Sequence, residues 1–425
     1  MRRSGAPSRV AWLLAALSAG ACSAVPAPTP PPSASSHAVA LVGGRVQPSP
    51  EAAPISDGVV LIDGSRILAV GPRAQVPLPP GASVIDCAGA TVTAGFWNSH
   101  VHFTGPEFQG AESAPAERLA DGLRLMLTSR GVAHVVDTGS WLQNTLALRR
   151  RIESGEILGP SILTAGSGFA PAGGSPYYIL PARLPELGDT AAAAELVTAE
   201  LDRGGDVVKL FTGSWARRDA IVVMPIDIVR AAVETAHRRG KLVFAHPSNS
   251  AGARSAIEGG VDILAHTFPS ELDRKPWDRA LPQMMKDRRM ALVPTLKLWP
   301  YELNKVALPP AVVEAVLGNG MAQLRAFSDL GGQVLFGTDV GYMTDFDPTD
   351  EYVYMQRAGL SYAAILGALT TAPAARFGAV ARAGRLVPGM DADVTVLDGD
   401  PAQDIRALGR VRLTLRAGKI LYRAS

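Results

Sequence analysis

The sequence predicts an α/β fold, in which a (β/α)8 TIM barrel carries a small discontinuous β-sandwich domain built from both flanks. Between residues 91 and 380, short apolar strands alternate with helical patterns, as in βα units around a parallel sheet. Eight such strands fit into this stretch, which is the number that closes a barrel. Short β-prone segments occupy residues 38–90 and 381–425, so we expect the two flanks to pair with each other.

The composition is that of a large globular protein. The chain has 425 residues, of which 47% are hydrophobic and 19% charged, enough for a large core and more than one domain. The formal net charge is +2; residues 1–21 contain three of the 41 basic residues, and the remaining 38 stand against 39 acidic ones. The sequence has no basic run with interleaved aromatic residues, so a nucleic-acid partner is not expected.

The N-terminal region has the pattern of an exported protein. Residues 1–21 combine early arginines with the apolar segment Val10–Leu17, which is typical of a signal peptide, and residues 22–37 form a Pro- and Ser-rich tether. Ala19-Gly-Ala-Cys22 is similar to a bacterial lipobox, although it lacks the usual Leu three residues before the Cys. We expect a periplasmic or cell-envelope protein with a lipid anchor at Cys22; simple cleavage of the leader is the alternative.

The flanking segments are predicted to form short strands. Val59–Ile62 and Ile67–Val70 surround a turn and indicate a β-hairpin, and Ser83–Asp86 is a further strand. Behind the barrel, Asp391–Leu397 and Val411–Leu415 return to strands. The only other cysteine, Cys87, lies among small apolar residues and is expected to be a core thiol; two cysteines do not make a disulfide framework.

The predicted barrel strands end in residues that carry chemistry. Active sites of such barrels lie at the C-terminal ends of the strands. Between strands, Pro225–Arg239 has an apolar face and Gly240 as its C-cap, as expected for a barrel helix. The eight strands are predicted to end at His102, Asp137, Ala165, Phe211, His246, His266, Thr295 and Asp339.

His100 and His102 form a His-x-His pair at the end of the first barrel strand, Thr91–His102. Residues two apart on a strand face the same side, so both imidazoles point into one space. Alone, the pair is equally compatible with two unrelated histidines. Together with His246, His266 and Asp339 on the same barrel face, it predicts a metal site whose ligands suit Zn, Mn, Fe or Co.

Lys209 lies in the apolar strand Val207–Phe211, where an unpaired ammonium is costly to bury. A cation beside metal ions would also be repelled. Reaction of the neutral amine with carbon dioxide would remove both problems, because it gives an anionic carbamate with two oxygens. The alternative is a structural lysine whose ammonium reaches solvent.

These motifs, with Gly95–His102, Phe336–Asp339 and Leu386–Leu397, resemble the amidohydrolase superfamily. The resemblance is to the binuclear branch with imidazolonepropionase-like and Xaa-Pro dipeptidase-like enzymes, and it covers the chain from about Ala38 to the end. Asn98 differs from the pattern, because relatives often have Asp before His-x-His.

The resemblance implies two divalent transition metals, with Zn²⁺ preferred. One would be held by His100, His102 and Asp339 and the other by His246 and His266. Carboxylated Lys209 and a hydroxide would bridge them. Such a hydroxide would attack a carbonyl polarised by the second metal, and Asp339 would carry the proton to the leaving group.

Aromatic residues just past the strand ends predict a roomy, partly apolar pocket. Each is individually as compatible with loop packing. The candidate substrate-binding residues are Tyr177, Tyr178, Trp215, Trp299 and Tyr342. His134, early in a strand, and His237, on a polar helix face, are expected to be structural.

We therefore expect a metal-dependent hydrolase of C–N amide bonds, of the acyl-amino acid or dipeptide type, acting on a small molecule. Hydrolysis of cyclic amides, lactones or related esters on the same site is the first alternative. A mononuclear deaminase would leave Lys209 unexplained, and a non-catalytic surface binding protein would be expected to lack part of the ligand set. A membrane contact is expected only through the lipid anchor.

Overall fold

The computed structural model describes residues 38–268, 271 and 275–425, all within one compact unit, Ser33–Ser425. The signal peptide at 1–21, the lipidation site Cys22 and the tether at 22–37 lie outside the described residues. Among the residues described, no helix combines the length and the apolar character needed to cross a bilayer.

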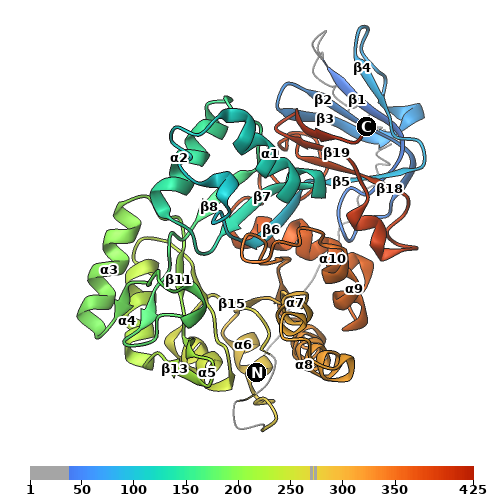
Figure 1. Ribbon diagram of the computed structural model, residues 1–425. Helices are drawn as coiled ribbons and strands as arrows, with labels where there is room; N and C mark the ends of the chain where they lie inside the picture. Colours follow the sequence, from blue (N-terminus) through green and yellow to red (C-terminus); the bar gives the residue numbers. More distant parts are fainter. Residues whose placement is uncertain (1–37, 269–270, 272–274) are drawn as a thin grey trace, which may run out of the picture. The chain divides into compact units, whose positions relative to one another are not determined.

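The central part of the fold is parallel β-structure, as the alternating pattern predicts. It consists of a three-stranded sheet and a five-stranded sheet (Figure 1). The first contains β6 (Phe96–Val101), β7 (Val132–Asp137) and β8 (Ser161–Thr164). The second contains β11 (Val208–Leu210), β14 (Val243–Ala245), β15 (Ile263–Ala265), β16 (Ala291–Val293) and β17 (Gln333–Val334).

The edges of these two sheets are joined by single bridges and hydrogen bonds, and the expected closed barrel is not seen as one continuous ladder. Beyond β8, Phe169 bridges Leu210, the last residue of β11. At the other edge, Val340 bridges Val101, and the amide of Asp339 donates to the carbonyl of His100 at 2.9 Å. Continuous pairing stops because β17 has only two residues and the chain turns at Asp339, whose φ is 64°.

Helices follow most of the parallel strands. In Figure 1, α3, α4 and α5 lie beside the strands of the second sheet, with α4 preceded by Pro225 and followed by Gly240 at φ 66°, as predicted. The α-helices are α1 (Ala116–Met126), α2 (Leu142–Glu153), α3 (Thr190–Asp202), α4 (Ile226–His237), α5 (Ser250–Gly259), α6 (Leu281–Asp287), α7 (Leu298–Asn304), α8 (Pro310–Asp329), α9 (Thr349–Arg357), α10 (Tyr362–Leu369) and α11 (Thr371–Arg376). The inner face of α4 is buried: Val229, Ala232, Val233 and Ala236 join the main apolar core.

The two flanks of the chain pair with each other in one eight-stranded sheet. Figure 1 shows the N-terminal strands in blue beside the C-terminal strands in red, and β5 pairs antiparallel with β18. The strands are β1 (Val39–Val46), β2 (Ile55–Asp63), β3 (Arg66–Pro72), β4 (Ser83–Asp86), β5 (Ala90–Ala94), β18 (Val394–Asp398), β19 (Val411–Arg416) and β20 (Lys419–Arg423). Cys87 is 1% exposed in its core, so the core-thiol prediction is confirmed.

The sandwich expected for these flanks is not confirmed, because the strands of both flanks form one sheet. Within this sheet, β1 pairs with two different strands along its length. Its first part, Val39–Val42, pairs with β4, and its last part, Arg45–Val46, pairs with β5. Between them the register shifts around Gly43, which has φ 86° and lets the strand bend.

Two small pairs of strands were not predicted from the sequence. Parallel β9 (Ala170–Pro171) and β10 (Glu186–Leu187) lie in the long loop after β8. The hairpin of β12 (Gly213–Arg217) and β13 (Ala220–Val223) follows β11 directly. The amide of Gly213 donates to the carbonyl of His246 at 3.1 Å, so the hairpin begins beside a predicted metal ligand.

Candidate metal centre

The end of β6 and the loop after β17 bring His100, His102 and Asp339 together. Oδ1 of Asp339 lies 2.8 Å from Nε2 of His102 and 3.3 Å from Nε2 of His100. One ligand atom from each residue lies within 4.8 Å of the other two. This is the set expected to hold one metal ion.

His246 and His266 continue this group of side chains from the ends of β14 and β15. The ring centroid of His266 lies 4.6 Å from that of His100 and 4.6 Å from that of His246. His266 has φ 74° and Asp339 has φ 64°, a left-handed backbone that non-glycine residues rarely adopt. Such strain at two neighbouring functional candidates is typical of active sites.

Lys209 is buried in the same place, on β11. The residue is 1% exposed, and within residues 38–268, 271 and 275–425 its ammonium has neither an ion pair nor a hydrogen bond. Its Nζ lies 5.6 Å from the ring centroid of Phe211. Burial lowers the pKa of Lys209 to about 8, although the charge of Asp339 opposes this shift.

Two hydrogen bonds fix which ring nitrogens carry protons. Nδ1 of His102 lies 2.8 Å from the carbonyl oxygen of Gly139, which can only accept, so Nδ1 is the donor. Nδ1 of His266 lies 2.6 Å from Oγ1 of Thr295, whose hydroxyl donates to the carbonyl of Pro294 at 2.9 Å. The hydroxyl has one proton, so His266 donates to it. In both residues Nε2 is left with its lone pair for a ligand.

The residues fit a bound metal ion. Neither ring nitrogen of His100 has a hydrogen-bond partner among the described residues, although the side chain is fully buried. Burial and then the charge of Lys209 lower the pKa of His100 and of His246 to about 3, so both rings are neutral, as metal ligands must be. Nε2 of His102 and the Asp339 carboxylate are two acceptors 2.8 Å apart, an arrangement that requires a proton or a cation.

Asp339 is held in its charged form. Burial alone would raise its pKa, but the neighbouring His100 and His102 outweigh burial and hold the pKa well below its usual range. A carboxylate in this position can bind a cation and can also exchange a proton with a substrate.

Asp137 supports His102 through a network that the sequence reasoning missed. Its carboxylate accepts hydrogen bonds from the hydroxyls of Ser140 (2.6 Å), Thr145 (3.0 Å) and Thr164 (2.8 Å), and from the amide of Gly139 (3.2 Å). These bonds fix the turn whose Gly139 carbonyl orients His102. The signal in the sequence was Asp137 itself, a carboxylate at a predicted strand end followed by Thr-Gly-Ser.

Asn98 joins β6 to the segment before Asp339. Its Nδ2 donates to the Thr338 hydroxyl at 2.7 Å, and its Oδ1 accepts from the Thr338 amide at 3.2 Å and the His100 amide at 3.3 Å. An amide provides both a donor and an acceptor for this role. Asn98, which stands where relatives often have Asp, therefore supports the site from beside the ligands and is not one of the predicted ligands.

The predicted substrate residues divide into three groups. Tyr178 contacts both Tyr177 and Tyr342, with ring centroids 5.6 Å and 5.7 Å apart. Trp299 donates its indole N–H to the Thr267 hydroxyl at 3.1 Å, next to His266. Trp215 lies in β12, and no described contact connects it to the ligands. The three tyrosines are thus the group that forms a continuous wall.

The remaining two histidines of the described chain have structural partners. Nε2 of His134 lies 2.8 Å from Oδ2 of Asp393, and its ring stacks on Trp97 at 4.4 Å. Nε2 of His237 lies 2.9 Å from Oδ2 of Asp262. Both arrangements agree with the structural roles expected for them.

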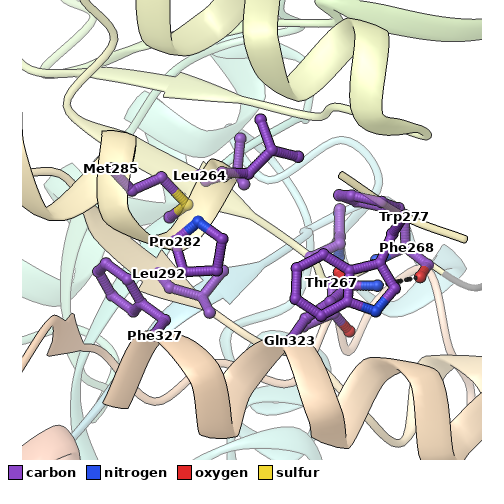
Figure 2. A pocket seen from close by; sticks show the side chains of 11 residues that line it. Leu264, Thr267, Phe268, Trp277, Pro282, Met285, Leu292, Gln323 and Phe327 are labelled. Carbon is purple, nitrogen blue, oxygen red and sulfur yellow. Dashed lines mark hydrogen bonds between the residues drawn. The ribbon is translucent and has the colours of Figure 1, made fainter. Parts of the chain in front are cut away.

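An apolar cavity lies behind β15 and β16, against α6 and α8 (Figure 2). Of the predicted ligands, only His266 reaches its wall. Gln323 donates to the carbonyl of Phe268 at 2.7 Å and accepts from its amide at 3.1 Å, which holds the chain just after His266. The cavity therefore belongs to the packing that supports β15, and the tyrosine wall is the better candidate for substrate contact.

Comparison with known proteins agrees with this geometry. The model of the amidohydrolase family matches residues 91–421. Ochratoxinase of Aspergillus niger is 24% identical over 401 residues, covering 83% of this chain and 80% of that protein. A prolidase structure with N-methylphosphonate-L-proline has a TM-score of 0.74 and 25% identity, covering 91% of this chain and 100% of that one. A Xaa-Pro dipeptidase with bound methionine has a TM-score of 0.77 and 21% identity over the same shares, which shows similarity of fold.

Proposed function

Because this chain belongs to the amidohydrolase family and is a metal-dependent hydrolase of C–N bonds, we propose that its substrates are small amides of the acyl-amino acid or dipeptide type. The observation that carries this proposal is the meeting of His100, His102 and Asp339 in ligand geometry. The similarity to proteins named ochratoxinase and prolidase supports amide substrates with an amino-acid part.

We propose two metal sites, with Zn²⁺ preferred because four imidazoles and a carboxylate suit it. His100, His102 and Asp339 would hold one ion, and His246 and His266 the other. Lys209 would connect them after carboxylation, in which its neutral amine forms a C–N bond to carbon dioxide and releases one proton. The support is that Lys209 is buried without a partner beside the four histidines.

When bound, the metals supply a water molecule with a pKa lowered from 15.7 towards about 7 and polarise the scissile carbonyl. The chain itself would do the rest. Asp339 would hold the proton released by the attacking water at its carboxylate and pass it to the leaving amine. Gly139 and Thr295 would keep Nε2 of His102 and His266 aimed into the site. The tyrosine wall would exclude bulk water on one side.

The proposal includes a barrel in which the two parallel sheets act together. The hydrogen bonds from Phe169 to Lys209 (2.9 Å) and from His102 to Val340 (2.8 Å) connect the sheets at both edges, and both lie at the level of the ligands. All predicted ligands would then lie at one end of eight parallel strands, where such folds carry their sites.

We also propose export to the cell envelope with a lipid on Cys22, on the basis of the leader and the tether. In a bacterial host, labelled palmitate should enter the wild type and leave Cys22→Ser unlabelled and soluble. Equal solubility of the two proteins without label would favour simple cleavage of the leader.

The substrate proposal is tested with metal-replete protein and a matched panel. An N-acyl-amino acid, a dipeptide, a cyclic amide and a lactone are compared by their kcat/KM. We expect the linear amides to be hydrolysed at least about tenfold better, which corresponds to about 1.4 kcal/mol of transition-state binding. A preference for the cyclic amide or the lactone would replace the proposed substrate class by the first alternative.

A further inference from the structure

A second cavity lies between β6, α1 and α9, and its wall includes Asn98, Met126 and Tyr352, one from each of these elements. The space measures about 220 Å³, which includes a part that is open to solvent. Among the described residues, none of the predicted metal ligands lines it, and it shares no lining residue with the apolar cavity behind β15. It is therefore a separate space beside the metal centre.

Arg130 is the only charged residue among the described residues that line this cavity. It ends the short 3-10 helix η3, Thr128–Arg130, which follows α1. In the described part of the chain its guanidinium has no ion pair and no hydrogen bond, although its Nε is buried. Burial raises the pKa of Tyr352, so the phenol in the wall adds no negative charge. A buried donor without an acceptor is costly, and such a group calls for an explanation.

Thr338 provides a second donor in the same wall. Its hydroxyl oxygen accepts from Nδ2 of Asn98 at 2.7 Å and from the amide of Val340 at 3.4 Å. Nδ2 must be the donor in the first bond, because Oδ1 of the same side chain accepts from two backbone amides. The proton of the Thr338 hydroxyl is therefore available, and it has no acceptor within residues 38–268, 271 and 275–425.

The carboxylates in the loop that borders the cavity are bonded elsewhere. Oδ2 of Asp345 lies 2.8 Å from Nζ of Lys297, and Oδ1 of Asp345 accepts from the Asp347 amide at 3.1 Å. Oδ1 of Asp347 accepts from the amide and the hydroxyl of Thr349, at 2.9 Å and 2.6 Å. Neither carboxylate lines the cavity or pairs with Arg130. The charge of Arg130 is thus left without a paired anion.

We propose that this cavity binds a small monovalent anion, which accepts hydrogen bonds from the Arg130 guanidinium and the Thr338 hydroxyl. Hydrogen bonds from a guanidinium to an anion are charge-assisted and strong. A single negative charge balances the single cation, and the apolar remainder of the wall disfavours an ion of higher charge. Chloride and formate both have this chemistry. No covalent bond changes when the anion binds.

The anion would connect the two segments that carry one set of metal ligands. Thr338 directly precedes Asp339, and Asn98 lies two residues before His100. The bonds between Asn98 and Thr338 already join these segments, and an anion on Thr338 would hold the second segment to Arg130 as well. We therefore expect slower release of metal when the anion is bound. This consequence rests on the proposed metal centre, whereas anion binding itself does not.

The test compares the full-length, Zn²⁺-loaded wild type with Arg130→Met and Arg124→Met. Arg124 is exposed on α1 and paired with Asp121, so its replacement removes the same charge outside the cavity. Each protein is measured in sodium chloride, formate and gluconate at equal ionic strength, since gluconate is a bulky anion. Chloride or formate, at about tenfold above its Kd, should raise Tm by about 2 °C over gluconate. Zn²⁺ transfer to EDTA should slow by about fivefold.

Both effects should disappear in Arg130→Met and persist in Arg124→Met. A response to chloride alone would identify a halide site, and a response to formate as well would extend the site to small carboxylates. An equal response in Arg130→Met would place the anion elsewhere, at the metal centre for example, and would overturn the proposal.

Anomalous diffraction from wild-type crystals in bromide locates the ion without any substitution. We expect a bromide peak within hydrogen-bond distance of the Arg130 guanidinium. Absence of this peak at saturating bromide would mean that water fills the cavity, and the proposal would fail. A peak at Arg130 with equal Zn²⁺ transfer in all three salts would refute the coupling alone. A protein that binds no Zn²⁺ would refute the proposed metal centre, while the bromide position would still decide the anion site.

Discussion

At the scale of single residues, the candidate site is defined by what orients its ligands. His102 is fixed by the Gly139 carbonyl, and His266 by Thr295, so the same nitrogen is free in both rings. Partners of this kind usually tune both metal affinity and ligand basicity. The hydrogen-bond partners of His102 and His266 therefore determine how these two predicted ligands are oriented.

Lys209 provides the sharpest residue-level prediction. Lys209→Ala should remove metal and activity together, because both ions lose an anionic ligand. Acetate or propionate in excess should restore part of the activity in the variant and none in the wild type, since either acid fits the space and supplies two oxygens. Elemental analysis and hydrolysis rates are measured on the same samples. Near-normal metal and activity in Lys209→Ala would remove the bridging role.

Asp339→Asn tests the proton-transfer role. The change is nearly isosteric, so the fold should persist, while kcat at saturating metal should fall by about 10²–10⁴-fold. Asp350→Asn, an exposed change at the start of α9, serves as the control and should leave kcat unaltered. If kcat of Asp339→Asn stays at the wild-type level across the pH range, another group carries the proton.

The ligand candidates could be predicted from the sequence because they sit at strand ends, where spacing alone fixes the direction of a side chain. Their partners could not be. The Gly139 carbonyl belongs to a turn, and the bond from His266 to the Thr295 hydroxyl depends on a left-handed backbone of Thr295 at φ 44° that the sequence does not reveal. Tyr178 was included as one aromatic residue among several, because sequence spacing does not show that its ring contacts those of Tyr177 and Tyr342.

At the scale of elements, the loop after β17 is positioned by close backbone contact with β6. Gly341 has φ 97°, and a Cβ at this position would lie 1.8 Å from the carbonyl oxygen of His102. No side chain can be accommodated there unless the loop moves away from β6. The loop that carries Asp339 and Tyr342 therefore depends on this glycine.

Gly341→Ala should accordingly destabilise the protein by at least about 1–3 kcal/mol and reduce metal retention. Gly318→Ala is the matched control, since Gly318 lies inside α8 with open space around it and should gain up to about 1 kcal/mol. Urea unfolding and elemental analysis provide the two readouts. A Gly341→Ala protein with wild-type stability and metal content would show that the contact is not needed.

The sequence pattern predicted some elements closely. The predicted strand Ser83–Asp86 matches β4, and the predicted helix Pro225–Arg239 contains α4. The hairpin β12–β13 was missed, because Trp215 was interpreted as an isolated pocket residue beyond the β11 strand end. Its pairing includes a register shift at Trp215/Arg217, which interrupts the alternation that identifies strands.

At the scale of the whole molecule, the flanking sheet is connected to the parallel strands by a buried hydrogen bond between two side chains. His134 of β7 meets Asp393, which directly precedes β18, and the other oxygen of Asp393 accepts from the Ala417 amide at 2.7 Å. Burial alone would raise the pKa of Asp393, but the charge and hydrogen bond of His134 outweigh it and lower the pKa.

The number of predicted strands could not show whether the barrel closes or whether the two flanks form a sandwich. Both features depend on how the edge strands of the sheets pair, which the sequence pattern does not reveal.

A lowered pKa means that Asp393 stabilises the fold above the unfolded value of about 4, and that this contribution is lost as pH falls below it. Asp393→Asn should cost about 1–3 kcal/mol at pH 7 and flatten the fall in stability towards pH 3. Asp219→Asn, which alters an exposed pair with Arg217, should change stability by less than about 1 kcal/mol. Parallel pH profiles for wild type and Asp393→Asn in urea unfolding would refute the linkage.

The most direct test of the account is a metal titration of the stripped protein with Zn²⁺, in which bound metal and hydrolysis of an N-acyl-amino acid are measured in the same sample. We expect no hydrolysis without metal and a maximum at about two ions per chain, because both ions act on one substrate. Maximal hydrolysis at one ion per chain, or undiminished hydrolysis after complete removal of metal, would contradict it.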